Sequence, residues 1–275
     1  MSVSLADYEF VCKLVQDHSS IALGAGKEYL VDARLAPLAQ REGLDSVGDL
    51  VQAVRVGGPR LRDVIVEAMA TNETSFFRDV HPFDALRDTI IPGILAANGG
   101  LRLSMWSAAA STGQEAYSLA LLVREHFPDI PHVTILATDL AGDVLARAKT
   151  GRYTQLEVNR GLPAAMLVKH FDRDGREWQL KPSIRNMVTF NQLNLARPFR
   201  NIGPMDVIFL RNVLIYFESP MKAAVLTEMS RVLRPGGSLF LGACETTFGI
   251  DDRYERVPVG RTSCYRFIGA DRGTP

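Results

Sequence analysis

The sequence has few of the features that mark several common classes of protein. Its 275 residues include only three cysteines, Cys12, Cys244 and Cys264, which are widely separated and show none of the spacings of a zinc site. We therefore expect free thiols, a reducing compartment and no bound metal. Lysine plus arginine and aspartate plus glutamate both number 31, so the formal net charge is zero. The chain therefore lacks the overall positive charge that would favour nucleic acid as a partner.

Long hydrophobic runs are also missing. No apolar stretch approaches the roughly 18 residues that a membrane-spanning helix requires. The N-terminus does not show a basic and then apolar signal segment. The sequence thus predicts a cytoplasmic protein without direct membrane insertion, and we expect a monomer. Hydrophobic residues make up 47% of the chain, which is enough for the core of one large or two modest domains.

Residues 1–90 show helical periodicity and no convincing strand. We expect a small all-helical domain followed by its linker. In the second predicted helix Lys27, Arg34 and Arg41 recur every seven residues, so they project from one face. This face is either a solvated surface or a docking surface for an acidic helical partner.

The stretch LRLSMWSAAASTGQEAYS, residues 101–118, predicts a buried strand, a turn of small residues and the start of a helix. The small side chains let a ligand approach the backbone, and the N-terminus of the helix suits polar or anionic groups. Ser107, Ala109 and Ala110 stand where the three-glycine dinucleotide fingerprint would have glycines. A close-packed turn without a ligand is the structural alternative.

From residue 101 onward apolar strand segments alternate with helical segments, which predicts an α/β fold with a doubly wound, Rossmann-like sheet. The short connection RYERVPVGR between the last two predicted strands, SLFLGAC and SCYRFIG, predicts a hairpin and hence an antiparallel edge strand. Between residues 152 and 188 the alternation stops. A helix over 166–171 and short strands turning at 172–175 predict a small inserted antiparallel β subdomain, so the second domain spans 91–275 with this insertion.

Polar residues follow the predicted strands where each ends. In such a sheet, ligands bind outside the carboxyl ends of the strands. An acid at the end of the second strand can hold the two hydroxyls of a ribose, which makes Asp139 a candidate for nucleoside binding, although it can also cap the next helix. The residues at these ends are Glu115, Asp139, Asn194, Arg211 and Asn212.

The segment TNETSFFRD, residues 71–79, places hydroxyl, amide and charged side chains beside two aromatic ones. As a structural alternative, Thr71 or Asn72 caps a helix while Phe76 and Phe77 enter the core. That alternative gives Arg78 no role.

Five short motifs follow the predicted helical domain in this order: TNETSFFRD, WSAAASTGQEAYS, ATDL, RNVLIYF and LRPGGSLFLG. In this order they resemble the chemotaxis receptor methyltransferases, the CheR family, over nearly the whole chain. The resemblance implies a helical domain, then an S-adenosylmethionine-dependent methyltransferase fold with an inserted antiparallel subdomain. It also implies that the protein esterifies glutamate side chains on the cytoplasmic helices of chemoreceptors and releases S-adenosylhomocysteine.

The resemblance further assigns roles to individual residues. Arg78 would contact the cofactor and lie close to the reacting centre, and Tyr216 would face the substrate, although Tyr216 can also be an aromatic packed in VLIYF. Gln114 and Leu210 depart from the residues usual in the family, at positions not expected to carry chemistry. The implied cofactor contacts are Asn72, Thr74, Arg78, Glu115, Asp139, Asn194, Leu195, Arg211 and Asn212.

Two other functions are compatible with the same fold. A nicotinamide oxidoreductase is disfavoured, because the glycine fingerprint and a histidine at a strand end are both missing. A non-catalytic module that binds S-adenosylmethionine remains an alternative, against which Arg78 and Tyr216 argue. Some members of the family pair their inserted subdomain with a peptide at the end of a receptor tail. The tight, charged turn at 172–175 leads us to expect no such pentapeptide requirement here.

Overall fold

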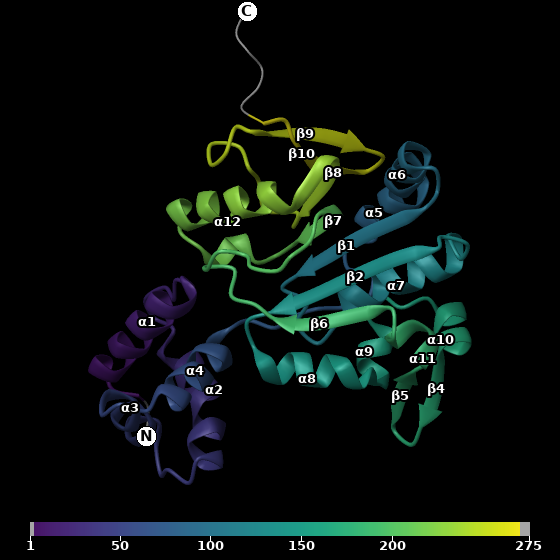
Figure 1. Ribbon diagram of the computed structural model, residues 1–275. Helices are drawn as coiled ribbons and strands as arrows, with labels where there is room; N and C mark the ends of the chain where they lie inside the picture. Colours follow the sequence, from purple (N-terminus) through teal and green to yellow (C-terminus); the bar gives the residue numbers. More distant parts are fainter. Residues whose placement is uncertain (1–2, 270–275) are drawn as a thin grey trace, which may run out of the picture.

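The structure is a computed structural model that describes residues 3–269, and its N-terminal part consists of packed helices. Figure 1 shows them as a cluster beside one end of the sheet. Fully buried apolar residues, among them Val11, Val31, Leu35 and Leu50, form a core of their own between these helices. The helices are α1 (Leu5–Ser19), α2 (Glu28–Arg41), α3 (Val47–Arg55) and α4 (Pro59–Met69).

A linker leads from α4 to three further helical segments that pack on the sheet. They are α5 (His81–Ala85), the π-helix η1 (Leu86–Ile90) and α6 (Ile91–Asn98). Phe83, Leu86 and Ile91 belong to the same buried cluster as Leu103 and Phe209 of the sheet. Residues 81–90, which periodicity groups with the linker, are therefore physically part of the sheet domain. TNETSFFRD caps no helix, since the next one begins at His81.

The central sheet has the order β6-β2-β1-β7-β8-β10-β9. From β6 to β8 neighbouring strands are parallel, while β10 pairs antiparallel with both β8 and β9. The doubly wound sheet is therefore confirmed. The strands are β1 (Arg102–Ala108), β2 (His132–Asp139), β6 (Val188–Gln192), β7 (Met205–Leu210), β8 (Leu233–Leu241), β9 (Tyr254–Val259) and β10 (Thr262–Phe267).

One prediction about the edge of the sheet needs correction. The connection RYERVPVGR itself contains a strand, β9. This strand lies at the edge of the sheet, and β10 lies between β9 and β8. The hairpin joins β9 to β10, which pair from Thr262–Val259 to Phe267–Tyr254, and not SLFLGAC to SCYRFIG as predicted. The predicted antiparallel pairing of these last two strands is correct, because β10 pairs antiparallel with β8. The alternation of apolar residues is too irregular in RYERVPV to mark it as a strand from sequence.

Helices cover both faces of the sheet (Figure 1). They are α7 (Gln114–His126), α8 (Gly142–Thr150) and α12 (Ser219–Val232). Because side chains alternate along a strand, Val207 and Phe209 of β7 join the cluster beneath α7, while Ile208 and Leu210 join the cluster beneath α12. No helix within residues 3–269 is both long and apolar enough to cross a bilayer.

The inserted segment forms a small antiparallel sheet of order β3-β5-β4, as predicted. Its turn lies at Gly175 and Arg176, because Asp172, Arg173 and Asp174 already belong to β4. Its elements are β3 (Arg152–Thr154), α9 (Gln155–Asn159), α10 (Ala164–His170), β4 (Phe171–Asp174), β5 (Glu177–Leu180) and α11 (Pro182–Arg185).

Aromatic residues join this subdomain to the linker. The ring of Phe76 lies 5.0 Å from that of Tyr153 and 5.9 Å from that of Phe171, centroid to centroid. A β-carbon at Gly161 would lie 2.0 Å from the Phe76 carbonyl oxygen, so the linker crosses this glycine in direct contact. The subdomain therefore packs directly against the linker at Phe76.

Candidate functional site

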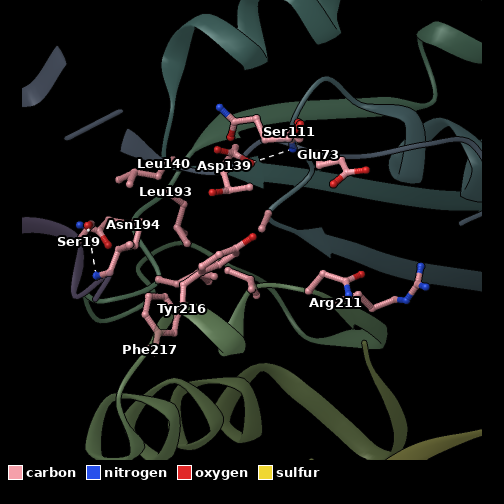
Figure 2. A pocket seen from close by; sticks show the side chains of 18 residues that line it. Ser19, Glu73, Ser111, Asp139, Leu140, Leu193, Asn194, Arg211, Tyr216 and Phe217 are labelled. Carbon is pink, nitrogen blue, oxygen red and sulfur yellow. Dashed lines mark hydrogen bonds between the residues drawn. The ribbon is translucent and has the colours of Figure 1, made fainter. Parts of the chain in front are cut away.

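A cleft of about 690 Å³, partly open to solvent, lies at the carboxyl ends of β1, β2, β6 and β7. The chain order reverses between β1 and β7, which is where doubly wound sheets bind ligands. Figure 2 shows side chains from the end of α1, the linker and several strand ends around this space. The lining includes Ser19, Ile21, Asn72, Glu73, Ser111, Asp139, Leu140, Leu193, Asn194, Leu195, Arg211, Asn212 and Tyr216.

The turn after β1 forms one wall of the cleft. Ala109 and Ser111 have positive φ angles of 89° and 50°, which non-glycine residues rarely adopt. The N–H groups of Ala109 and Ala110 both donate to the Thr138 carbonyl at 2.8 Å, and the Ser111 N–H donates to the Asp139 carboxylate at 2.8 Å. A backbone kept in this conformation lies close enough to the cleft to contact a ligand directly.

Asp139 stands at the end of β2, 6% exposed and facing the cleft. Its carboxylate accepts hydrogen bonds from the N–H groups of Ser111 at 2.8 Å and Ala141 at 3.0 Å. Burial raises the pKa of Asp139, and these backbone donors oppose the rise. The N-cap of α8 is Ala141, so the structural alternative in which Asp139 caps this helix is not what the structure shows. An acceptor-only group with free lone pairs can take further hydroxyl donors.

Asn194 and Leu195 follow β6 and line the opposite wall. The Asn194 side chain donates to the His18 carbonyl at 2.7 Å and accepts from the Ala196 N–H at 2.9 Å. It thereby ties the cleft to the last turn of α1. Leu195, together with Leu140 and Leu193, supplies an apolar surface on which a flat ring can pack.

Arg211, at the end of β7, has a side chain that is 1% exposed and pairs with two carboxylates of the protein. Its guanidinium donates to Asp79 at 2.6 Å, to the Arg78 carbonyl at 2.9 Å and to Glu115 at 3.1 Å. Burial raises the pKa of Glu115, while the Arg211 charge and the bond from Ser107 oppose the rise. In Figure 2 the Arg211 side chain extends away from Asp139 and Asn194.

Tyr216 lies in a short 3-10 helix, η2 (Leu214–Tyr216), and lines the cleft. Its carbonyl accepts from the Ala22 N–H at 2.9 Å, and Ile21 forms a β-bridge with Phe217 beside it. The N-terminal helices and the strand ends thus build this wall jointly.

Glu245 is a residue of this region that sequence reasoning missed. Its carboxylate accepts the N–H groups of Gly242, Asn212, Val213 and Ile215 at 2.6 to 3.2 Å. It therefore holds the loop after β7 that carries Asn212, whose φ is 59°. The signal was available, because Glu245 is an acid just beyond the end of a buried strand, like Asp139.

The linker passes over the cleft, and the Asn72 carbonyl accepts from Ser111 Oγ at 2.7 Å. Arg78 donates to the Glu73 carbonyl at 3.1 Å. The structure brings Asn72, Asp139, Asn194, Leu195, Arg211, Asn212 and Tyr216 together around one cleft. Thr74, Arg78 and Glu115 are not among the residues that line it.

The basic face expected on α2 is only partly present. Lys27 and Arg41 are exposed, but Arg34 is half-buried and donates to the carbonyls of Met69 at 2.5 Å and Ala70 at 2.9 Å. It also donates to Thr71 Oγ1 at 3.1 Å. The prediction that Arg34 projects freely from this face is wrong, because its guanidinium holds the end of α4 and the start of the linker.

The described residues hold no cluster of histidine, cysteine, aspartate and glutamate that could bind a metal ion. The three cysteines are free thiols.

Two family models match the chain. The CheR methyltransferase all-alpha domain matches residues 6–70, and the CheR methyltransferase SAM binding domain matches residues 72–262. Chemotaxis protein methyltransferase 1 of Pseudomonas aeruginosa is 41% identical over 97% of this chain and 99% of its own length. Chemotaxis protein methyltransferase Cher2 of Pseudomonas putida is 41% identical over 94% and 96%. Chemotaxis protein methyltransferase 1 of Vibrio cholerae is 39% identical over 94% and 95%.

Proposed function

The chain belongs to the CheR methyltransferase family and uses S-adenosylmethionine as methyl donor, and we propose that it esterifies glutamate side chains of chemoreceptor cytoplasmic helices. The products are glutamate methyl esters and S-adenosylhomocysteine. One observation carries the proposal: a cleft at the switch point of the sheet has both the buried carboxylate of Asp139 and the phenol of Tyr216 in its lining.

The chemistry of the cleft fits this cofactor. Asp139 offers an acceptor for the ribose hydroxyls, and the leucines beside Asn194 offer an apolar surface for adenine. We propose that Asn72, Asp139, Asn194, Leu195 and Asn212 hold the cofactor from the cleft wall. For Thr74, Glu115 and Arg211, which the family resemblance also assigns to the cofactor, we propose roles in shaping the linker and the β1 turn.

When bound, S-adenosylmethionine supplies a methyl group on a sulfonium centre, which a carboxylate oxygen can attack. A glutamate is already ionised at neutral pH, so no residue has to remove a proton. We propose that Tyr216 and Arg78 orient the incoming carboxylate by hydrogen bonds. Apolar residues such as Ile21 and Phe217 would exclude water from it.

We propose that receptor helices dock beside α2 through the exposed Lys27 and Arg41, with Arg34 between them at the linker. The protein would act as a monomer in the cytoplasm, where the receptor helices lie. The turn at Gly175 and Arg176 is tighter than the sequence predicts, so we keep the proposal that no receptor tail pentapeptide is required. Titration of such a pentapeptide into the protein tests this point, and a micromolar dissociation constant would contradict it.

The test of function uses labelled S-adenosylmethionine and a receptor cytoplasmic fragment. We expect base-labile label on the fragment, released as methanol, and none on a matched fragment whose acceptor glutamates are glutamines. Binding of S-adenosylhomocysteine without transfer would favour the non-catalytic module. Binding of a dinucleotide in its place would favour an oxidoreductase.

A further inference from the structure

The segment that carries Arg78 has an unusual backbone. Phe77, Asp79 and Val80 have positive φ angles of 46°, 66° and 45°. Residues other than glycine rarely adopt this region, and a β-branched residue such as Val80 is especially disfavoured there. A backbone of this kind persists only where the surrounding structure holds it. The contacts that hold residues 77–80 therefore decide where Arg78 stands.

Anchors flank the segment on both sides. The Phe77 N–H donates to Ser118 Oγ on α7 at 2.9 Å, and the ring of Phe83 on α5 lies 5.4 Å from that of Phe209. Between these anchors Arg211 Nη2 donates to the Arg78 carbonyl at 2.9 Å and to Asp79 Oδ2 at 2.6 Å. One guanidinium thus holds both the main chain at Arg78 and the side chain that follows it.

Arg211 can serve as a fixed point because the protein encloses it. Its Nη1 donates to Glu115, and its guanidinium lies 5.7 Å from the ring centroid of Phe209. Glu115 is held in turn by Ser107 Oγ at 2.7 Å. A buried guanidinium is costly without its anionic partners. Asp79, whose side chain is 47% exposed, is the solvent-facing partner in this cluster.

From this arrangement we propose that Asp79 is a positioning residue for Arg78. Its carboxylate accepts a hydrogen bond from Arg211 and thereby fixes the strained backbone of residues 77–80. The linker then holds the Arg78 guanidinium in one position. The proposal rests on the role proposed above for Arg78 in methyl transfer. Asp79 is not among the residues that line the cleft, so it would act through Arg78.

The first test is a double-mutant cycle with the intact protein. Asp79→Asn keeps the side-chain shape and removes the charge. Asp88→Asn is the matched control, because Asp88 accepts from Arg87 at 2.7 Å in an exposed ion pair on η1. We expect Asp79→Asn to lower kcat for methylation about tenfold in the wild-type background and to cause no further loss in the Arg78→Ala background. Equal losses in both backgrounds would overturn the proposal.

The second test needs no methylation. The Val80 N–H donates to the Phe77 carbonyl at 2.9 Å within the segment, so its hydrogen exchange reports whether the segment opens. Asp79→Asn should speed exchange at residues 77–81 at least tenfold and leave α12 unchanged. Unchanged exchange overturns the proposal whatever the activity. Faster exchange in a protein whose wild type methylates no receptor fragment supports the positioning contact and rejects the proposed function.

Discussion

The turn after β1 and the linker before α5 both meet the cleft, and both contain non-glycine residues with positive φ. They are stabilised in opposite ways. The turn consists of small residues, and it is held mainly by the N–H groups of Ala109 and Ala110, which bond to the Thr138 carbonyl, with one side-chain bond from the Ser111 N–H to Asp139. The linker carries larger residues, and side chains hold it, chiefly Arg211 and Ser118.

This difference affects how each region responds to substitution. A side-chain change cannot remove bonds between main-chain groups, so the turn should keep its conformation in most variants. The linker loses its restraint when one charge or one close contact changes. In the proposed function the turn binds the cofactor and the linker presents Arg78. Because the linker depends on side-chain contacts and the turn mainly on main-chain bonds, the conformation of the linker could change without a change in the turn.

The largest effect should come from Gly161→Ala. The new β-carbon would lie 2.0 Å from the Phe76 carbonyl oxygen, and Gly161 has a φ of 91°. Either the linker or the subdomain loop must move. We expect a loss of roughly 3 kcal/mol in the free energy of unfolding and faster exchange along the linker. Gly203→Ala is the control, since a β-carbon there meets no atom within 4 Å. Similar stability of the two variants would show that the linker is not tightly held by the subdomain.

Asp139→Ala addresses the other region. The bonds of Ala109 and Ala110 to Thr138 remain, so the turn should persist, while a charged acceptor in the cleft is lost. We expect S-adenosylhomocysteine to bind more weakly by roughly 1 to 3 kcal/mol with the fold intact. Calorimetry measures the affinity, and Asp143→Ala, exposed at the start of α8, is the matched control. Unchanged affinity would mean that the Asp139 carboxylate does not contact the cofactor.

The sequence predicts the turn after β1 better than it predicts the linker before α5. Small residues between an apolar strand and a helix indicate the turn, and the acid that ends β2 indicates Asp139. Both signals are local. The contacts of the linker join residues far apart in sequence, such as Arg211 with Asp79, and no pattern within one segment reveals them. The heptad spacing wrongly predicted an exposed Arg34 for the same reason. The end of α4 that Arg34 contacts lies 35 residues away in sequence, so no local pattern reveals the contact.

Ser111→Ala tests the hydrogen bond that joins the two regions. Ser111 Oγ donates to the Asn72 carbonyl at 2.7 Å, while the Ser111 N–H donates to Asp139. Alanine keeps the second bond and removes the first. We expect about 1 kcal/mol of lost stability and faster exchange near Asn72, with little change at Ala109 and Ala110. Ser104→Ala, within β1, is the control. Faster exchange throughout the turn would contradict its independence from the linker.

The smallest effect concerns pH and again separates the regions, because it depends on Asp139. Burial raises the pKa of this carboxyl above 3.8 in the folded protein, so the folded state binds the proton more tightly than the unfolded chain. Its stabilising contribution is therefore complete below the unfolded pKa and is lost as pH rises through the raised value. Asp139→Asn removes this dependence.

Relative to wild type, the Asn variant should gain stability as pH rises above the unfolded pKa of the carboxyl and through its raised folded pKa, measured as the difference in free energy of unfolding. Ser104→Ala changes no titratable group and should differ from wild type by the same amount at every pH. A constant difference for Asp139→Asn would mean that the N–H groups of Ser111 and Ala141 stabilise the carboxylate as strongly as burial disfavours it. The turn after β1 would then already supply the charge complementarity that the linker obtains from Arg211.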